Sequence, residues 1–194
     1  MPKPVNLNLP SSLKPLQQGA LDSLCGMYAA INAIRIADDF EAQPHRNIGS
    51  VLSTAAVKYL SRRGELGSIF RFGMGYKRQR ELTKHLLKSY RNQYGGEIVL
   101  RPSKDSLLPL DQFIESEIKT GNPVCVCLEG AISHYTIIQG ISKKQVLLFD
   151  SGDRKFFQRS SISLKGKDEA KRYWIKTSSV YSIEFVDPWE EADF

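Results

Sequence analysis

Four residues whose side chains can together activate a thiol occur in the order Gln18, Cys25, His134 and Asp150. A cysteine becomes an effective nucleophile when a histidine accepts its proton and a carboxylate orients that histidine. A nearby glutamine amide can donate a hydrogen bond to the oxyanion that forms when the thiolate attacks a carbonyl carbon. The order therefore predicts a nucleophile at Cys25, a general base and acid at His134, an orienting carboxylate at Asp150 and an oxyanion donor at Gln18.

Cys25 is predicted to lie in the first turn of an apolar helix. Apolar residues recur around it in the steps of three and four that mark one helical face, at Leu24, Met27, Tyr28, Ile31 and Ile34. Asp22 or Ser23 is the expected N-cap, so free N–H groups and the helix dipole would favour a thiolate at Cys25. Gly26 is expected to leave room for a substrate backbone beside the sulfur. The alternative is that Cys25 is a buried residue that only packs.

The histidine and the aspartate are predicted to meet across a hairpin. Short apolar strands joined by polar turns are expected at 122–128, 134–141 and 146–150, which is the pattern of an antiparallel meander. His134 then begins one strand and Asp150 ends its partner, so the two side chains lie side by side. His45, in a polar loop, and His85, in a basic helical stretch, lack such a setting.

Several short motifs along the chain share an order with a known family. They are Gln18, Cys25-Gly26, Gly121-Asn122-Pro123-Val124, His134-Tyr135 with Gly140, and Asp150. Over about residues 13–155 this order resembles the papain-like fold in its bacterial form, and most of all the bacteriocin-processing double-glycine peptidases and their stand-alone bacterial relatives. The resemblance implies an α+β fold in which an N-terminal helical part carrying the nucleophile packs on an antiparallel β-meander. It implies for the four site residues the same roles as above.

The sequence departs from that family pattern at two places. Gln18 precedes Cys25 by seven residues, one more than the pattern has, and Gln17 is farther still. The choice between Gln18 and Gln17 as the oxyanion donor therefore stays open. Ser151 follows Asp150 where the pattern has proline.

The remaining sequence completes a single predicted domain over 1–194. Helices are expected at 48–60, 77–90 and 110–119, and strands at 97–101 and 180–186. The order of helices first and strands second is typical of an α+β layout. The glycine-rich aromatic segment 70–76 is predicted to be a flexible rim near the cleft. Residues 1–12 are predicted to be an extended arm, and 187–194 an acidic tail.

The other two cysteines are predicted to be structural. Cys125 and Cys127 alternate with apolar residues, so both thiols face one side of a strand. A redox pair or a pair of metal ligands is the functional interpretation, but no second Cys/His pair at ligand spacing accompanies them. We therefore favour two small buried residues and predict neither a cofactor nor a metal. Free thiols suit a reducing compartment, so we expect a cytoplasmic protein or one exported without a cleavable signal peptide.

The formal net charge of +6 leaves the partner open. Basic residues gather at 62–63, 71–80, 84–91 and 165–172. An acidic partner for this basic face is one interpretation, and an ordinary solvated surface is the one we favour. Nucleic acid is not expected, because no recognisable nucleic-acid module is present. The longest apolar runs are too short to predict a membrane span.

The sequence therefore predicts a thiol-dependent hydrolase that cleaves a peptide or isopeptide bond in a protein or peptide substrate. Hydrolysis is favoured over transfer because a flexible rim at 70–76 would leave the cleft open to water. One alternative is a bacterial effector or toxin with glutamine deamidase, transglutaminase-like or acyltransferase activity on the same scaffold. Another is a papain-like module that binds a partner without catalysis.

Overall fold

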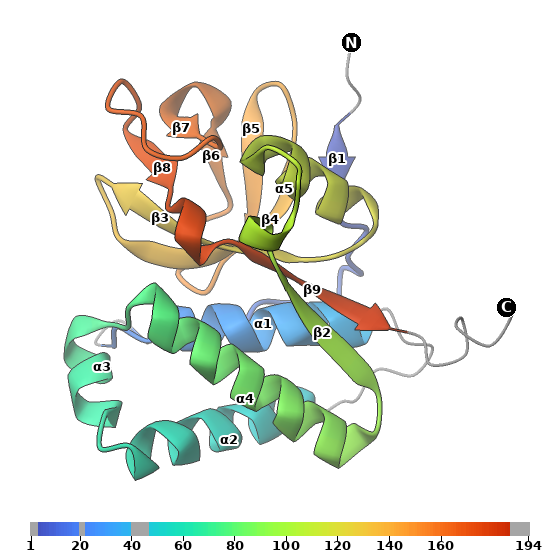
Figure 1. The fold of residues 1–194 in the computed structure, drawn as a ribbon, viewed down its shortest axis with the longest axis vertical. Helices are drawn as coiled ribbons and strands as arrows, with labels where there is room; N and C mark the ends of the chain where they lie inside the picture. The colour runs from blue at the N-terminus through green and yellow to red at the C-terminus, as the bar shows by residue number, and fades with distance from the viewer. Residues whose placement is uncertain (1–3, 20–21, 40–46, 187–194) are drawn as a thin grey trace, which may run out of the picture.

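The computed structural model describes residues 4–19, 22–39 and 47–186, and this part of the chain has an α+β fold with five helices and a largely antiparallel sheet (Figure 1). The predicted acidic tail at 187–194, the first three residues of the predicted arm, and His45 lie outside the described residues.

The helices and strands follow the predicted order closely. The helices are α1 (Cys25–Asp39), α2 (Ile48–Arg62), α3 (Leu66–Phe72), α4 (Tyr76–Tyr94) and α5 (Leu110–Lys119). The strands are β1 (Val5–Asn6), β2 (Glu97–Pro102), β3 (Val124–Gly130), β4 (His134–Ile141), β5 (Gln145–Phe149), β6 (Phe156–Gln158), β7 (Ile162–Ser163), β8 (Tyr173–Ile175) and β9 (Tyr181–Val186). Short 3₁₀ turns lie at Ser103–Asp105, Arg159–Ser161 and Thr177–Ser179.

The predicted meander forms the centre of the sheet. Its order is β2-β9-β3-β4-β5-β6, with β1 paired to β4 and β8 paired to β3. All these pairs are antiparallel, whereas β7 and β8 pair in parallel. The predicted arm is therefore not free, because β1 joins the sheet. A Cβ at Gly140 would lie 2.9 Å from the carbonyl oxygen of Val5, so the glycine of the His-Tyr motif allows this close pairing.

Helix α1 lies between the sheet and the layer formed by α2 and α4 (Figure 1). A helix enclosed on both sides needs apolar residues around most of its circumference. Its fully or almost fully buried apolar residues are Ala30, Ile31, Ala33, Ile34, Ile36 and Ala37. One continuous hydrophobic core joins them to side chains of the sheet and of α2 and α4. Helix α1, which begins at Cys25, is thus held by both layers.

The prediction of a flexible glycine-rich rim at 70–76 is wrong in its first half, where α3 ends at Phe72. The end of α3 is attached to the turn that precedes Cys25. The Ser23 N–H donates to the Phe70 carbonyl at 3.0 Å, and the Ser23 hydroxyl donates to the Arg71 carbonyl at 3.3 Å. Gly73 follows with a φ of 74°, a conformation that favours glycine.

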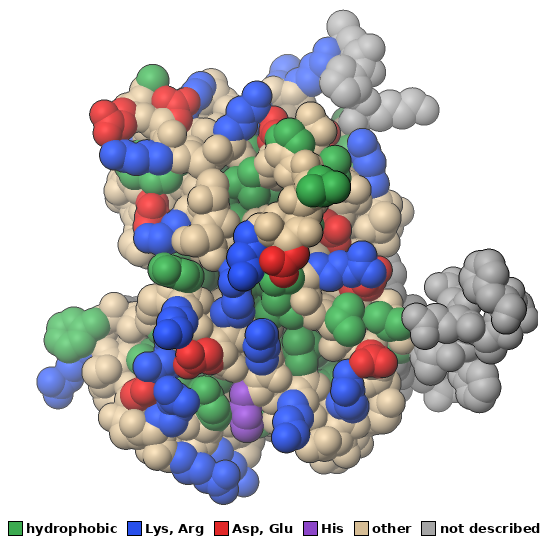
Figure 2. Space-filling model, viewed as in Figure 1, with side chains coloured by type: hydrophobic (Ala, Val, Ile, Leu, Met, Phe, Trp, Pro, Cys, Tyr) green, Lys and Arg blue, Asp and Glu red, His purple; other side chains and the backbone are tan. Residues whose placement is uncertain are grey.

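Charged side chains of both signs mix over the helical layer (Figure 2). Glu65 pairs with Arg78 and, at 3.2 Å, with Arg63. Glu81 lies 3.5 Å from Arg78 and 3.7 Å from Arg63. Part of the basic face is therefore neutralised within the chain, and its acidic partner stays a prediction. Within 4–19, 22–39 and 47–186, no helix combines the length and apolarity needed to cross a bilayer.

Candidate active site

Cys25 is the first residue of α1, and its side chain is half-buried. The Leu24 carbonyl accepts the first bonds of the helix, from the N–H groups of Met27 at 2.8 Å and Tyr28 at 3.0 Å. Leu24 is therefore the N-cap residue. The first N–H groups of a helix have no acceptor within it and carry the positive end of the dipole. Cys25 thus lies in the first turn, where the sequence predicted it.

The prediction of Asp22 or Ser23 as the N-cap is wrong by one or two residues. The Asp22 carboxylate instead folds the preceding turn, because it accepts hydrogen bonds from the N–H groups of Gly19 at 2.9 Å and Leu24 at 3.0 Å. The Ser23 hydroxyl instead donates to the Arg71 carbonyl in α3. The segment just before Cys25 is therefore held from both sides.

Gln18 lies in this turn and links it to the aspartate loop. Its Nε2 donates to the Asp22 carbonyl at 2.5 Å, which uses one of the two amide hydrogens. Its main-chain N–H donates to the Ser151 carbonyl at 2.8 Å. The Gln17 side chain is exposed. When its amide is oriented so that the nitrogen faces the nearby acceptors, it donates to the Ser151 carbonyl at 2.7 Å and to Asp153 Oδ1 at 3.2 Å. Gln18 therefore keeps one amide hydrogen that can bond to an oxyanion, whereas Gln17 uses both of its amide hydrogens, and this favours Gln18 as the oxyanion donor.

His134 and Asp150 make the predicted contact, with 2.6 Å between His134 Nε2 and Asp150 Oδ1. His134 begins β4 and Asp150 directly follows β5, and the register of the two strands puts Asp150 beside Thr136 on the same face as His134. The other oxygen of Asp150, Oδ2, accepts from the N–H groups of Gly152 at 2.9 Å and Arg154 at 3.3 Å. The carboxylate is only 3% exposed, so its orientation is fixed.

The same contacts shift the pKa values of both groups. Burial works to lower the pKa of His134, but the hydrogen bonds to Asp150 and Cys25 outweigh it and raise the pKa to about 9. Burial works to raise the pKa of Asp150, but the hydrogen bonds to His134 and Thr136 and to the Gly152 N–H hold it below its usual range. Near neutral pH the pair is therefore an imidazolium and a carboxylate.

The Cys25 thiol is the second partner of the His134 ring, since its hydrogen bond and charge both contribute to the raised pKa. Asp150 occupies Nε2, so Nδ1 is the ring nitrogen left for the sulfur. The structure thus brings together a thiol from α1, an imidazole from β4 and a carboxylate from the end of β5. An imidazolium beside a sulfur stabilises the thiolate, and the carboxylate holds the ring in place.

Cys125 and Cys127 face α1, and both are buried. The Cys125 thiol donates to the Ala29 carbonyl at 3.7 Å, whereas Cys127 packs with Ala29, Tyr135 and Cys25. Burial is the main cause that raises the pKa of Cys125 to about 12 and that of Cys127 to about 11. These thiols are therefore small buried residues, as predicted, although the sequence did not predict that Cys127 borders the site.

The sequence also did not single out Gln79, a buried side chain of α4 that holds the start of α1. Its Nε2 donates to the Tyr181 hydroxyl at 2.6 Å and to the Gly26 carbonyl at 3.3 Å. A Cβ at Gly26 would lie 3.0 Å from Met74 Cγ and 3.1 Å from Gln79 Cγ. The expectation that Gly26 leaves room for substrate is therefore wrong, because Met74 and Gln79 take that space.

Replacing Gln79 with leucine should lower the free energy of unfolding by about 1–3 kcal/mol, because the buried Gly26 carbonyl and Tyr181 hydroxyl lose a donor. Urea unfolding followed by circular dichroism measures the change. Gln93→Leu is the matched control, since Gln93 is an exposed residue on the same helix. Equal stability of the two variants would contradict a structural role for the Gln79 side chain.

The His134 pKa predicts a loss of stability at alkaline pH. A histidine whose pKa rises from 6.5 to about 9 on folding stabilises the fold fully below pH 6.5, and this stabilisation is lost as pH rises through about 9. The effect is on the order of 3 kcal/mol. Urea unfolding of the wild type and His134→Gln between pH 6 and 10 measures it as the difference between the two proteins.

His85 is the control for this pH dependence, because burial lowers its pKa rather than raising it. His85→Gln should therefore keep the alkaline loss of stability, whereas Cys25→Ala should move that loss to lower pH. A wild type and a His134→Gln variant that lose stability in parallel would contradict the raised pKa.

The sequence matches no protein-family model and no curated protein. Among the residues that the structure describes, no group of three or more His, Cys, Asp or Glu side chains is arranged to hold a metal ion. The functional interpretation of the site therefore depends on the geometry of Cys25, His134 and Asp150 and on the resemblance of the motifs.

Proposed function

We propose that the protein is a papain-like thiol hydrolase that cleaves a peptide or isopeptide bond. The observation that carries the proposal is the position of one imidazole between two partners. The His134 ring lies 2.6 Å from the buried Asp150 carboxylate, and the half-buried Cys25 thiol is near enough to help raise the pKa of the ring. A buried histidine with a purely structural role needs neither a charged partner nor a thiol at a helix start.

The proposed reaction begins with attack of the Cys25 thiolate on the carbonyl carbon of the substrate. A C–S bond forms, and the carbonyl oxygen becomes an oxyanion that accepts hydrogen bonds from the Gln18 amide and the main-chain N–H of Cys25. The imidazolium of His134 donates its proton to the leaving amine as the C–N bond breaks. An acyl-enzyme and a free amine are the products of this step.

Water completes the reaction in the second step. Neutral His134 accepts a proton from water, the hydroxide attacks the thioester carbonyl, and the carboxylic acid and the thiolate are released. A cavity of about 470 Å³ adjoins His134 and is lined mainly by polar residues, including Gln18, Ser133 and Ser151. This polar opening gives water a path to His134, the base that activates it, and it replaces the flexible rim as the reason to favour hydrolysis.

Mass spectrometry of a mixed peptide and protein library tests the proposal. The library is incubated with the wild type, with Cys25→Ala and with Cys125→Ala as a matched cysteine control. Cleavage products with the wild type and Cys125→Ala but not with Cys25→Ala are expected. A gain of about 1 Da per modified glutamine or addition of an amine would contradict hydrolysis but retain the thiol mechanism. Cleavage products that persist with Cys25→Ala would contradict both hydrolysis by this site and the thiol mechanism.

A further inference from the structure

A groove leads away from His134, and Cys25 is not among the residues that line it. The cavity of about 470 Å³ beside His134 adjoins a second one of about 540 Å³. The two share Gln17, Asp150, Asp153 and Arg154, whereas Cys25 lines neither of them. The groove therefore begins at the base and continues between the N-terminal segment and the end of β5.

The lining of the outer cavity combines an apolar floor with basic side chains. Its apolar residues are Leu9, Pro10, Leu13, Pro15, Leu148 and Phe149. Its basic residues are Lys14, Arg154 and Lys155, and all three are exposed. A groove of this kind suits an extended segment that has both apolar and negatively charged side chains.

The basic residues of the groove outnumber its unpaired acidic residue. The charge of Asp150 is offset by His134, whereas Asp153 is exposed and keeps one negative charge against the three positive charges of the groove. Among the residues that the structure describes, Lys14, Arg154 and Lys155 form no ion pair. The groove therefore has a net positive charge, with three basic side chains available to a ligand.

Arg154 lies where the two cavities join, and its position is fixed at both ends. Its main-chain N–H donates to Asp150 Oδ2 at 3.3 Å, and its guanidinium lies 5.1 Å from the centre of the Phe157 ring. A guanidinium stacked on an aromatic ring loses less freedom when it binds a carboxylate. Arg154 is therefore well placed to select an acidic side chain near the scissile bond.

We infer that this groove binds the leaving-group segment of the substrate and selects acidic side chains in it. The direction rests on the proposed function, because His134 donates its proton to the leaving amine and the departing segment must begin beside that ring. From there the segment follows the groove past Arg154 to Lys155 and Lys14. The substrate class is thus a peptide with aspartate or glutamate within a few residues after the cleaved bond.

The inference is tested first with a chymotryptic peptide library from a whole-cell lysate, in which new N-termini are identified by mass spectrometry. The wild type should enrich Asp and Glu in the first few positions after the cut. The double variant Arg154→Glu with Lys155→Glu should cleave these peptides about tenfold less well, because each exposed charge contact is worth little alone and here two are reversed. Alkylation of Cys25 by iodoacetamide should stay within about twofold of the wild type.

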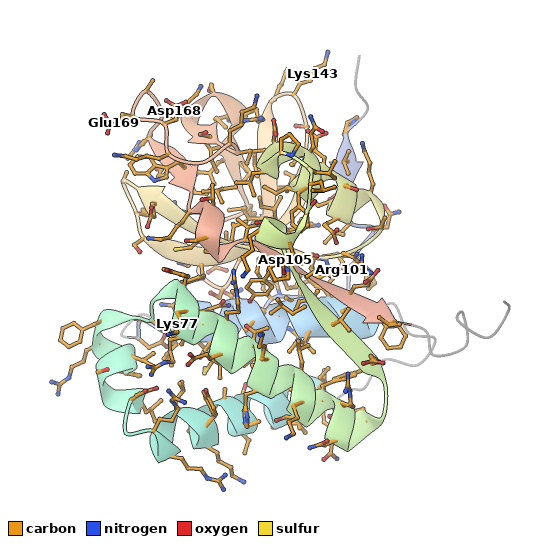
Figure 3. All side chains as sticks on the ribbon, in the orientation of Figure 1. Lys77, Arg101, Asp105, Lys143, Asp168 and Glu169 are labelled. Atoms are coloured by element: carbon orange, nitrogen blue, oxygen red, sulfur yellow. The ribbon has the colours of Figure 1, made fainter. Side chains whose placement is uncertain are left out.

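The matched control is the double variant Lys143→Glu with Lys88→Glu, which changes the net charge equally. Lys143 points outward at the tip of the β4–β5 turn (Figure 3), and Lys88 is exposed on α4. This control should keep the acidic preference. A wild type without acidic enrichment, or an Arg154/Lys155 variant that retains it, would overturn the inference.

A binding measurement separates this inference from the proposed function if the library is not cleaved. Cys25→Ala protein is titrated with a dye-labelled peptide of alternating leucine and aspartate, and with its leucine–lysine counterpart. Tighter binding of the aspartate peptide that is lost in Arg154→Glu with Lys155→Glu supports the groove even though the hydrolase proposal fails. Equal binding of the two peptides overturns the inference.

Discussion

At pH 7, iodoacetamide should alkylate Cys25 at least a hundredfold faster than Cys125 or Cys127. The pKa values of about 12 and about 11 for the two buried thiols leave only roughly 10⁻⁵ and 10⁻⁴ of them as thiolate at this pH. Cys25 is half-buried and faces an imidazolium whose pKa is about 9. Alkylation by the reagent, quenched at intervals and mapped by peptide mass spectrometry, measures the three rates in one experiment.

Two variants separate the role of the imidazolium from that of exposure. His134→Gln should slow alkylation of Cys25 by about tenfold or more at pH 6, because the positive partner of the thiolate is lost. His85→Gln, which changes a histidine on α4, should leave the rate unchanged. Slow alkylation of all three cysteines at similar rates would mean that Cys25 is an ordinary packed thiol and that the site is not a nucleophile.

Replacing Asp150 with asparagine should have the second large effect. The change leaves a buried imidazolium without its carboxylate, and loss of one partner of a buried pair costs about 3–5 kcal/mol of folding free energy. The His134 pKa should fall from about 9 toward 6.5 or below, since burial then acts with less opposition. Proton NMR titration of the histidine ring signals and urea unfolding at pH 6 measure the two effects.

Asp153→Asn is the matched control for this change. Asp153 lies three residues away, is exposed, and has a φ of 61°, a backbone conformation that asparagine tolerates well. This control should keep the wild-type titration and stability. If Asp150→Asn and Asp153→Asn had the same His134 pKa and the same free energy of unfolding, the Asp150 carboxylate would not be what raises the His134 pKa. Any hydrolytic rate found for the wild type should fall by about 10²–10⁴ in Asp150→Asn only.

The parts of the fold that repeat a local pattern could be predicted from the sequence. The steps of three and four around Cys25 predicted α1, and the apolar runs predicted β3 and β4, with His134 as the first residue of β4. Asp150 could be placed beside His134 because the strands of a short meander pair with their neighbours in the sequence. The contact between these two residues could therefore be predicted from the sequence.

The parts that depend on distant contacts could not be predicted. Helix α3 is short, and its N-cap residue, Glu65, makes no capping hydrogen bond, so only its attachment to Ser23 reveals it. The strands β6, β7 and β8 have two or three residues each, too few for a period to be read. Gln79 lies on a polar helix, and nothing in its neighbourhood indicates that it bonds to Tyr181 far along the chain.

The single core that encloses α1 restricts how a substrate could reach this site. Cys25 begins α1 and His134 begins β4, and most buried side chains of these two elements belong to one continuous core, apart from a small cluster of Ala29, Cys127 and Tyr135 beside Cys25. The helix and the sheet therefore cannot move apart without breaking that packing, and the positions of Cys25 and His134 are fixed relative to each other. A folded substrate of the proposed hydrolase would therefore have to present a flexible loop, a tail or a locally unfolded segment that can adapt to these fixed positions.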